Sequence, residues 1–160
     1  MATSTIIQKL YGADEAIAVP SVGQDNPFQS ARQCTLRFRT SGAVAVGESV
    51  RFDVTQPDSE RVSVVNQCTA GGPGGNRLAV GVALEASTAL GGEFINVVVG
   101  GYVENAICVA GAGAGDVLGV VTAAGELEAM AGPDVRGAIA IALENEAGGT
   151  CDVWIITKFP

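Results

Sequence analysis

Residues 80–85 read Val-Gly-Val-Ala-Leu-Glu, and residues 139–144 read Ile-Ala-Ile-Ala-Leu-Glu. After each stretch comes a small, polar connector that ends in a glycine pair, Gly91-Gly92 in the first case and Gly148-Gly149 in the second. A further strand-like segment follows both pairs. Self-similarity of this kind is typical of a scaffold built from supersecondary units that bury their faces on one another.

The similarity extends upstream, where residues 47–50 (Gly-Glu-Ser-Val) resemble residues 115–118 (Gly-Asp-Val-Leu). The offset between the two copies is larger at this landmark than at the Leu-Glu stretch or at the glycine pair. The first copy therefore holds extra residues, and the turn-rich run 70–76 is the obvious place for them. The sequence predicts two strand cassettes, at about 42–105 and 106–160.

Strand periodicity begins at residue 34. Apolar and polar residues alternate over 34–39, which places Cys34, Leu36 and Phe38 on one face. Glycine is abundant, with 22 residues, and aromatic residues make up only 5%, a mixture that favours short strands and tight turns. We expect an all-β fold, a compact sandwich or a squat, β-tulip-like barrel. The large side chains of residues 78–84 are expected to face one way: Leu78, Val80, Val82 and Leu84.

The segment 1–33 has no counterpart in the repeat. Within residues 26–29, Asn26 suits a helix N-cap and Pro27 the first helical position. We therefore predict an N-terminal arm, 1–33, with a short helical turn, followed by a β-domain over 34–160. The arm either packs on a partner surface or folds back as an edge strand of its own sheet. Its predicted partner-binding residues are Ile6, Ile7, Leu10, Tyr11 and Phe28.

Trp154 is a further predicted contact residue. It stands between Val153 and Ile155 in the last strand-like segment. In this position a tryptophan is expected to pack at a contact between lobes or subunits, and a platform for stacking a ligand is the alternative.

The charge balance bears on the choice of partner. The net charge is −8, which argues against a nucleic-acid partner. Residues 1–77 carry seven basic and seven acidic side chains, whereas residues 78–160 carry two basic and ten acidic ones. Charged residues make up only 16%, and seven of the nine basic residues are arginine, which favours a subunit that hides surface against neighbours. No apolar run is long enough for a membrane span, and residues 1–10 lack the apolar stretch of an export signal.

Residues that carry chemistry are scarce. The chain has no histidine, and its four cysteines lack zinc-ligand spacing, so we expect buried free thiols in a reducing cytoplasm. The carboxylate pairs Glu126/Glu128 and Glu144/Glu146 stand beside turns and are expected to be solvated. The glycine-rich run 111–116 lacks the spacing and the following helix of a dinucleotide-binding loop. The sequence predicts no enzyme, no catalytic residue, no metal site and no cofactor.

The cassette resembles the small capsid decoration (cement) proteins of tailed bacteriophages, over roughly residues 42–160. The closest match is Gly81-Val82-Ala83-Leu84-Glu85 with Gly91-Gly92-Glu93, and the second is Ala140–Glu144 with Gly148-Gly149. In that family two such cassettes build a sandwich or β-tulip fold. The arm 1–33 and the run 71–75 do not match the family pattern.

The resemblance implies a structural virion protein, made in the host bacterial cytoplasm. Such a subunit binds the major capsid protein on the outer surface of the shell and clamps neighbouring capsomers. It also implies a homo-oligomer, with a trimer favoured and a dimer second. The alternative from another class is a ligand-binding β-module of a phage appendage, which would recognise a carbohydrate or a receptor.

Overall fold

The computed structural model describes residues 33–132 and 135–156 of the 160-residue chain. The arm residues predicted to bind a partner, Ile6, Ile7, Leu10, Tyr11 and Phe28, lie outside this part. The described residues form nine strands and no helix, and hence no helix that could cross a membrane. The strands are β1 (Gln33–Thr40), β2 (Ser49–Phe52), β3 (Val64–Gln67), β4 (Ala79–Ala83), β5 (Phe94–Ile107), β6 (Val117–Gly119), β7 (Glu128–Ala129), β8 (Ala140–Ala142) and β9 (Thr150–Ile155).

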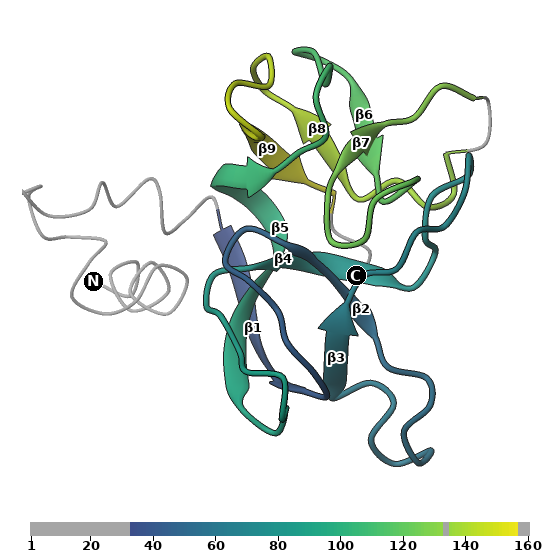
Figure 1. Cartoon of the computed structure of the whole chain (residues 1–160), viewed down its shortest axis with the longest axis vertical. Helices are drawn as coiled ribbons and strands as arrows, with labels where there is room; N and C mark the ends of the chain where they lie inside the picture. Colours follow the sequence, from purple (N-terminus) through teal and green to yellow (C-terminus); the bar gives the residue numbers. More distant parts are fainter. Residues whose placement is uncertain (1–32, 133–134, 157–160) are drawn as a thin grey trace, which may run out of the picture.

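The strands form two halves that share β5. Figure 1 shows β1 to β4 around one end of β5 and β6 to β9 around the other. In the first half the order is β1-β3-β2-β4-β5, and β5 pairs again with β1, which closes a five-stranded barrel. Closure removes the free sheet edges that invite aggregation. The predicted all-β fold is confirmed, with a barrel as the form it takes.

The long strand β5 joins the halves. Its first part pairs with β1 and β4, and its last part, from Gly101 onward, pairs with β9. The register between β5 and β9 shifts between Val103 and Ala106, and such a bulge bends a strand. The boundary predicted between the cassettes, at 105/106, falls inside β5 at this bulge. Beyond it the sheet continues in the order β9-β8-β6-β7.

The second half follows the same pairing plan as the first. The first half is closed by the parallel pair β1–β3, and its other pairs are antiparallel. In the second half, a parallel bridge joins Cys108, just after β5, to Leu127, just before β7. The remaining pairs, β5–β9, β8–β9, β6–β8 and β6–β7, are antiparallel. Strand order and pairing sense therefore correspond.

The turn glycines correspond as well. Gly47 and Gly115 have φ angles of 83° and 90°, a region in which residues with a Cβ are strained. The backbone N–H of Gly47 donates to the carbonyl of Ala83, and that of Gly115 to the carbonyl of Ala142, each at 2.8 Å. When the two sequence copies are aligned at their landmarks, Gly47 matches Gly115 and Ala83 matches Ala142. The repeated glycines thus make the same contact in both halves.

Glu85 and Glu144, which end the similar stretches 80–85 and 139–144, also have a structural role. A carboxylate oxygen of Glu85 accepts a hydrogen bond from the backbone N–H of Asn96 at 3.0 Å. Glu144 accepts one from the backbone N–H of Asp152 at 3.2 Å. Each glutamate therefore holds the end of one strand, β4 or β8, to the strand that follows it, β5 or β9.

Two buried clusters fill the molecule. The first-half cluster comprises Phe38, Val44, Val50, Val65, Val80, Ala83, Ile95, Val97 and Val99. The larger cluster contains second-half residues such as Leu118, Leu127 and Ile139, and it also takes in Cys68, Ala79, Val82 and Val98 from the first half. The two halves are therefore packed into one body.

The predicted facing of residues 78–84 is wrong. Val80 lies in the first-half cluster, whereas Val82 lies in the cluster of the second half. The register between β2 and β4 shifts beside Val80, and the bulge reverses which way the following side chains point. Leu78 and Leu84 are each 37% exposed. A period-2 pattern cannot show a bulge, because the bulge itself breaks the period.

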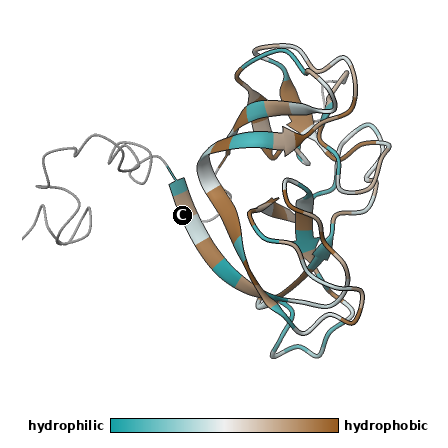
Figure 2. Cartoon of the chain, turned by 60° about the vertical axis from the view of Figure 1, so that its left-hand side comes forward, coloured by the Kyte–Doolittle hydropathy of each residue, from teal (hydrophilic) through white to brown (hydrophobic). Residues whose placement is uncertain are grey.

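Along β1 the predicted alternation is visible in Figure 2, where hydrophobic and hydrophilic residues follow one another. Phe38 is buried at 6% exposure, as expected, but Leu36 is 43% exposed and Cys34 is exposed. The register with β5 shifts between Cys34 and Thr35, which changes the face of Cys34. Leu36 keeps the face of Phe38, but it lies outside the part of β1 that pairs with β3, at Arg39 and Thr40.

Candidate interaction surface

Trp154 lies on β9 and is 41% exposed. Its cross-strand neighbours are Tyr102 on β5 and Ile141 on β8, and Ile141 is in turn paired with Val117 on β6. Ile141 is 36% exposed, and Tyr102 and Val117 are partly exposed. We call these four side chains the outer row, because they cross four neighbouring strands on the outside of the second half.

The sequence predicts Trp154 as a contact residue, but it does not predict the other members of the outer row. Within β9, buried residues alternate with more exposed ones, and Trp154 belongs to the exposed set. That alternation was readable in the sequence. What it could not show is which residues of β5, β8 and β6 lie beside Trp154, since this depends on register.

A carboxylate fixes Tyr102 in place. The hydroxyl of Tyr102 donates to Oδ2 of Asp152 at 2.5 Å, and the backbone N–H of Asn105 donates to Oδ1 of the same side chain at 3.1 Å. The hydrogen bond to Asp152, followed by burial, raises the pKa of Tyr102 to about 12. Asn105 has a φ of 55° within the β5 bulge. Asp152 thus anchors both the bulge and one end of the outer row.

The outer row has a negatively charged border. Glu104 and Glu144 are both exposed, and both carboxylates act on Tyr102 by Coulomb repulsion of its phenolate, as does Asp152. These groups belong to the acidic part of the sequence, which carries two basic and ten acidic residues over 78–160. A partner of this surface is therefore favoured if it is apolar and positively charged.

The corresponding row of the first half is covered. Val82 on β4 is paired with Ser49 on β2 and with Val98 on β5, just as Ile141 is paired across β6 and β9. All three residues are fully buried, at 0% exposure. Val82 and Val98 belong to the cluster of the second half, and the backbone N–H of Ser49 donates to the carbonyl of Gly125 at 2.8 Å. The same outer position is thus covered in one half and open in the other.

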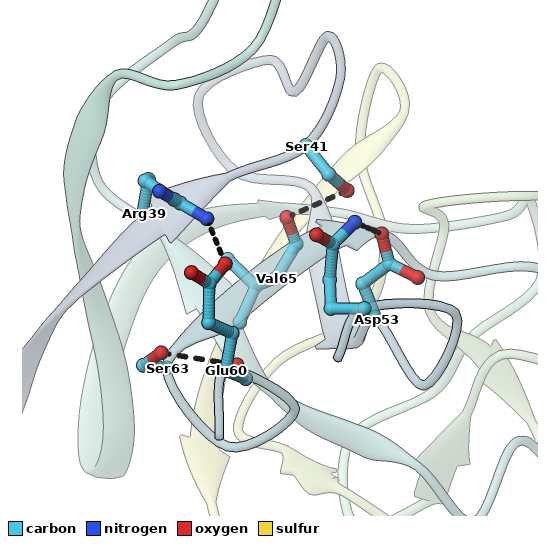
Figure 3. A network of polar contacts seen from close by, with 7 residues as sticks. Arg39, Ser41, Asp53, Glu60, Ser63 and Val65 are labelled. Carbon is cyan, nitrogen blue, oxygen red and sulfur yellow. Dashed lines mark hydrogen bonds and ion pairs between the residues drawn. The ribbon is translucent and has the colours of Figure 1, made fainter. Parts of the chain in front are cut away.

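A polar network on the first half stabilises a loop (Figure 3). Asp53 is 5% exposed, and its carboxylate accepts hydrogen bonds from Thr55 and Gln56. Burial opposes the charge on Asp53, but the hydrogen bonds outweigh it and hold the pKa of this carboxyl well below its usual range. Arg39 forms an ion pair with Glu60 beside it. The network is structural, since its groups satisfy one another.

The cysteines are unbridged. Cys68, Cys108 and Cys151 are buried, as predicted, whereas the prediction is wrong for Cys34, which is exposed. The sulfur atoms of Cys108 and Cys151 are 2.6 Å apart. Burial raises the pKa of both thiols, so they remain protonated at neutral pH.

The carboxylate pairs beside turns accept local hydrogen bonds. Glu128 accepts from Thr122 at 2.6 and 3.0 Å, and Glu146 accepts from the backbone N–H of Gly149 at 2.6 Å. Among the residues that the structure describes, no group of three or more acidic or cysteine side chains is placed to hold a metal ion. The carboxylates thus shape loops.

Comparison with known proteins gives a likeness of fold. No family model and no curated protein sequence matches the chain. Among solved structures, the N base of the head fiber protein gp8.5 of bacteriophage phi29 is similar, with a TM-score of 0.50 and 16% sequence identity. The match covers 80% of this chain and 98% of that one. At this identity, the likeness shows a shared fold.

Proposed function

We propose that this chain is a structural protein of a phage virion, a decoration subunit that binds the outer surface of the capsid shell. The observation that carries the proposal is the fold likeness to a phage head fiber base, which extends over 98% of that chain. The sequence resemblance to capsid decoration proteins points to the same location independently. The proposed partner is the major capsid protein, and neither nucleic acid nor a membrane is required.

The build of the molecule suits this role. A decoration subunit stabilises a shell only through contacts that exist in the assembled state, so it needs a rigid surface and no chemistry. The shared strand β5, with 14 residues, and the cluster that spans both halves make one rigid body. A standard protein interface buries about 1,600 Å² in total. A subunit with few charged residues can supply such an area at low desolvation cost.

We further propose that the protein acts as a homo-oligomer that clamps neighbouring capsomers, with a trimer favoured and a dimer second. The low charge content and the excess of arginine over lysine support association; the choice of three follows from the family resemblance. Light scattering on the purified protein at micromolar concentration measures the oligomer directly.

Co-sedimentation tests the capsid role. Shells of the parent phage that lack this protein are mixed with increasing amounts of the purified chain and separated on a density gradient. The proposal predicts saturable binding at a fixed ratio to the capsid protein, and a rise in the temperature at which filled heads release their genome. Shells that already carry the protein serve as the control and should take up none. Absence of binding to bare shells would contradict the proposal.

One observation keeps the ligand-binding alternative open. Tyr102 and Trp154 are adjacent aromatic side chains on the outside of the sheet, and such a pair can stack a sugar ring. A glycan array distinguishes the two functions. Binding of a defined glycan, together with quenching of Trp154 fluorescence by that glycan and no binding to shells, would favour the appendage module.

A further inference from the structure

The outer row of the second half is an apolar face that nothing in the described chain covers. It exposes Trp154 and Ile141, at 41% and 36%, and Leu143 beside them is 47% exposed. Contiguous apolar side chains of this kind on a sheet face are typical of an interaction site. At the corresponding row of the first half, Val82 and Val98 are packed into the cluster of the other half. A row at this position can therefore be buried by another part of the same chain.

The chain itself leaves the described fold beside this row. Gln33, where the described part of the chain begins, is paired with Gly101, and its side-chain amide donates to the carbonyl of Tyr102 at 2.8 Å. Tyr102 is the end member of the outer row. The preceding segment of the sequence, 1–32, is therefore attached directly at one end of the open face.

The sequence of this segment fits the face. Residues 5–11 read Thr-Ile-Ile-Gln-Lys-Leu-Tyr, and residues 1–12 contain Lys9 but no acidic side chain. The face is apolar, and Glu104, Asp152 and Glu144 border it. Apolar side chains with one positive charge match an apolar row with a negative border.

The chain between residues 5–11 and Gln33 is long enough for residues 5–11 to reach along the whole outer row. Neighbouring strands lie about 4.8 Å apart, so a row over four strands is roughly 14 Å long, which about five extended residues span. The whole stretch 12–32 separates residues 5–11 from Gln33, which leaves ample slack. Tethering gives such a segment an effective concentration in the millimolar range. A second copy that presented the same face would instead bring like charges together.

We propose that residues 5–11 of the same chain cover the outer row. This assigns the N-terminal apolar residues Ile6, Ile7, Leu10 and Tyr11 to their own subunit and not to a partner surface. It differs from an added edge strand, because the segment packs on the face of the sheet across β5, β9, β8 and β6. The inference does not depend on the proposed capsid role.

Trp154 is the only tryptophan, so its fluorescence reports on the row without a label. We would measure the emission maximum and the acrylamide quenching constant of the full chain and of a variant that lacks residues 1–12. The expected result is weak quenching in the full chain, and a red shift with a several-fold larger quenching constant after deletion. Far-UV circular dichroism should be unchanged.

A second variant avoids the deletion. I7S/L10S in the full chain should raise quenching in the same direction, whereas L90S, which alters a residue that is 95% exposed in a turn, should not. If deletion of residues 1–12 leaves the emission maximum and the quenching constant of Trp154 unchanged, the row is already open in the full chain and the proposal is wrong. Protection that disappears on dilution would also overturn it, since a second copy would then cover the row.

Discussion

The two halves of the molecule share a pairing plan but differ in what lies against their outer rows. Ser49, Val82 and Val98 of the first half are fully buried against the second half, while the equivalent positions of the second half carry Val117, Ile141 and Trp154 and are open. Both halves have the same turn glycines and the same kind of glutamate contact at the ends of β4 and β8. The halves therefore differ outside the shared plan, and the open row of the second half is the candidate interaction surface.

The two halves also differ in the sizes of the side chains that fill their interiors. A large cross-strand pair, Phe38 with Ile95, is buried in the first half, whereas the second half has the small pair Ala106 with Cys151 at the corresponding place. The second half has Leu127 at its closing bridge, where the first half has a valine. Since protein interiors are close-packed, volume lost at one position must be recovered at another. The same strand order thus accommodates two different cores.

The largest expected effect comes from the closing residue of the second half. Leu127 is fully buried, and Leu127→Ala should lower the free energy of unfolding by about 2–5 kcal/mol through lost burial and a residual cavity. Urea denaturation followed by circular dichroism measures this loss in the free energy of unfolding. Leu90→Ala, at a residue that is 95% exposed, is the control and should change stability by less than about 0.5 kcal/mol. Equal effects of the two substitutions would show that the second half is not closed as described.

A glycine in β4 sharpens the comparison, because its counterpart in β8 is Ala140. A Cβ on Gly81 would lie 2.0 Å from the carbonyl oxygen of Val98, so the strand must move to accommodate it. Gly81→Ala should therefore destabilise by about 1–3 kcal/mol, although alanine is intrinsically better in a strand. Ala140 is fully buried, so Ala140→Gly should cost about 1–2 kcal/mol from backbone entropy and the lost methyl group. Thermal unfolding measures the stability of both variants. A Gly81→Ala variant that is more stable than the unsubstituted protein would contradict the close approach of β4 to the carbonyl oxygen of Val98.

The Asp53 network predicts an acid sensitivity specific to the first half. The folded-state pKa of Asp53 is depressed, so its ionised form stabilises the fold above the unfolded pKa, about 3.9, and this contribution is lost as pH falls below that value. Asp53→Asn should lower the free energy of unfolding by about 1–2 kcal/mol at pH 7. Urea denaturation at several pH values should show this difference from the unsubstituted protein becoming smaller towards pH 2. A gap that stays constant with pH would exclude the ionised carboxylate as the cause.

The smallest effects are expected at Glu85 and Glu144. Glu144→Gln weakens a hydrogen bond from the backbone N–H of Asp152, whereas Glu85→Gln weakens two from Asn96, one from its backbone N–H and one from its side-chain amide, because a charged acceptor binds more strongly than a neutral one. Glu144→Gln should cost less than about 1 kcal/mol, and Glu85→Gln should cost more than Glu144→Gln. Glu126→Gln serves as the control. A larger loss at Glu144 than at Glu85 would contradict these contacts.

Much of the fold was predictable from local residues. Gly47 and Gly115 have positive φ angles, and Glu85 and Glu144 each accept a hydrogen bond from the strand that follows, so these sequence landmarks correspond to real turns and strand contacts. These features depend on neighbours close in sequence. Features that depend on register were not predictable: the bulge beside Val80 reversed the facing of β4.

The candidate site was only partly predictable for the same reason. Trp154 could be singled out as an aromatic residue in a late strand, but Tyr102 and Ile141 become its neighbours only through pairing between strands that are distant in the sequence. The shared strand was also not predictable, since β5 runs from Phe94 to Ile107 across the boundary predicted between the cassettes at 105/106. Long-range pairing, which no local pattern encodes, assembles the surface.

The most direct test of the proposed virion role is a cryo-electron microscopy map of the phage head on which we propose that this chain sits. The proposed role predicts density on the outside of the capsid shell that fits the two-half body, with β5 continuous between the halves and the body seated on the major capsid protein. A head surface without this density, or the same body found on the tail or inside the shell, would contradict it.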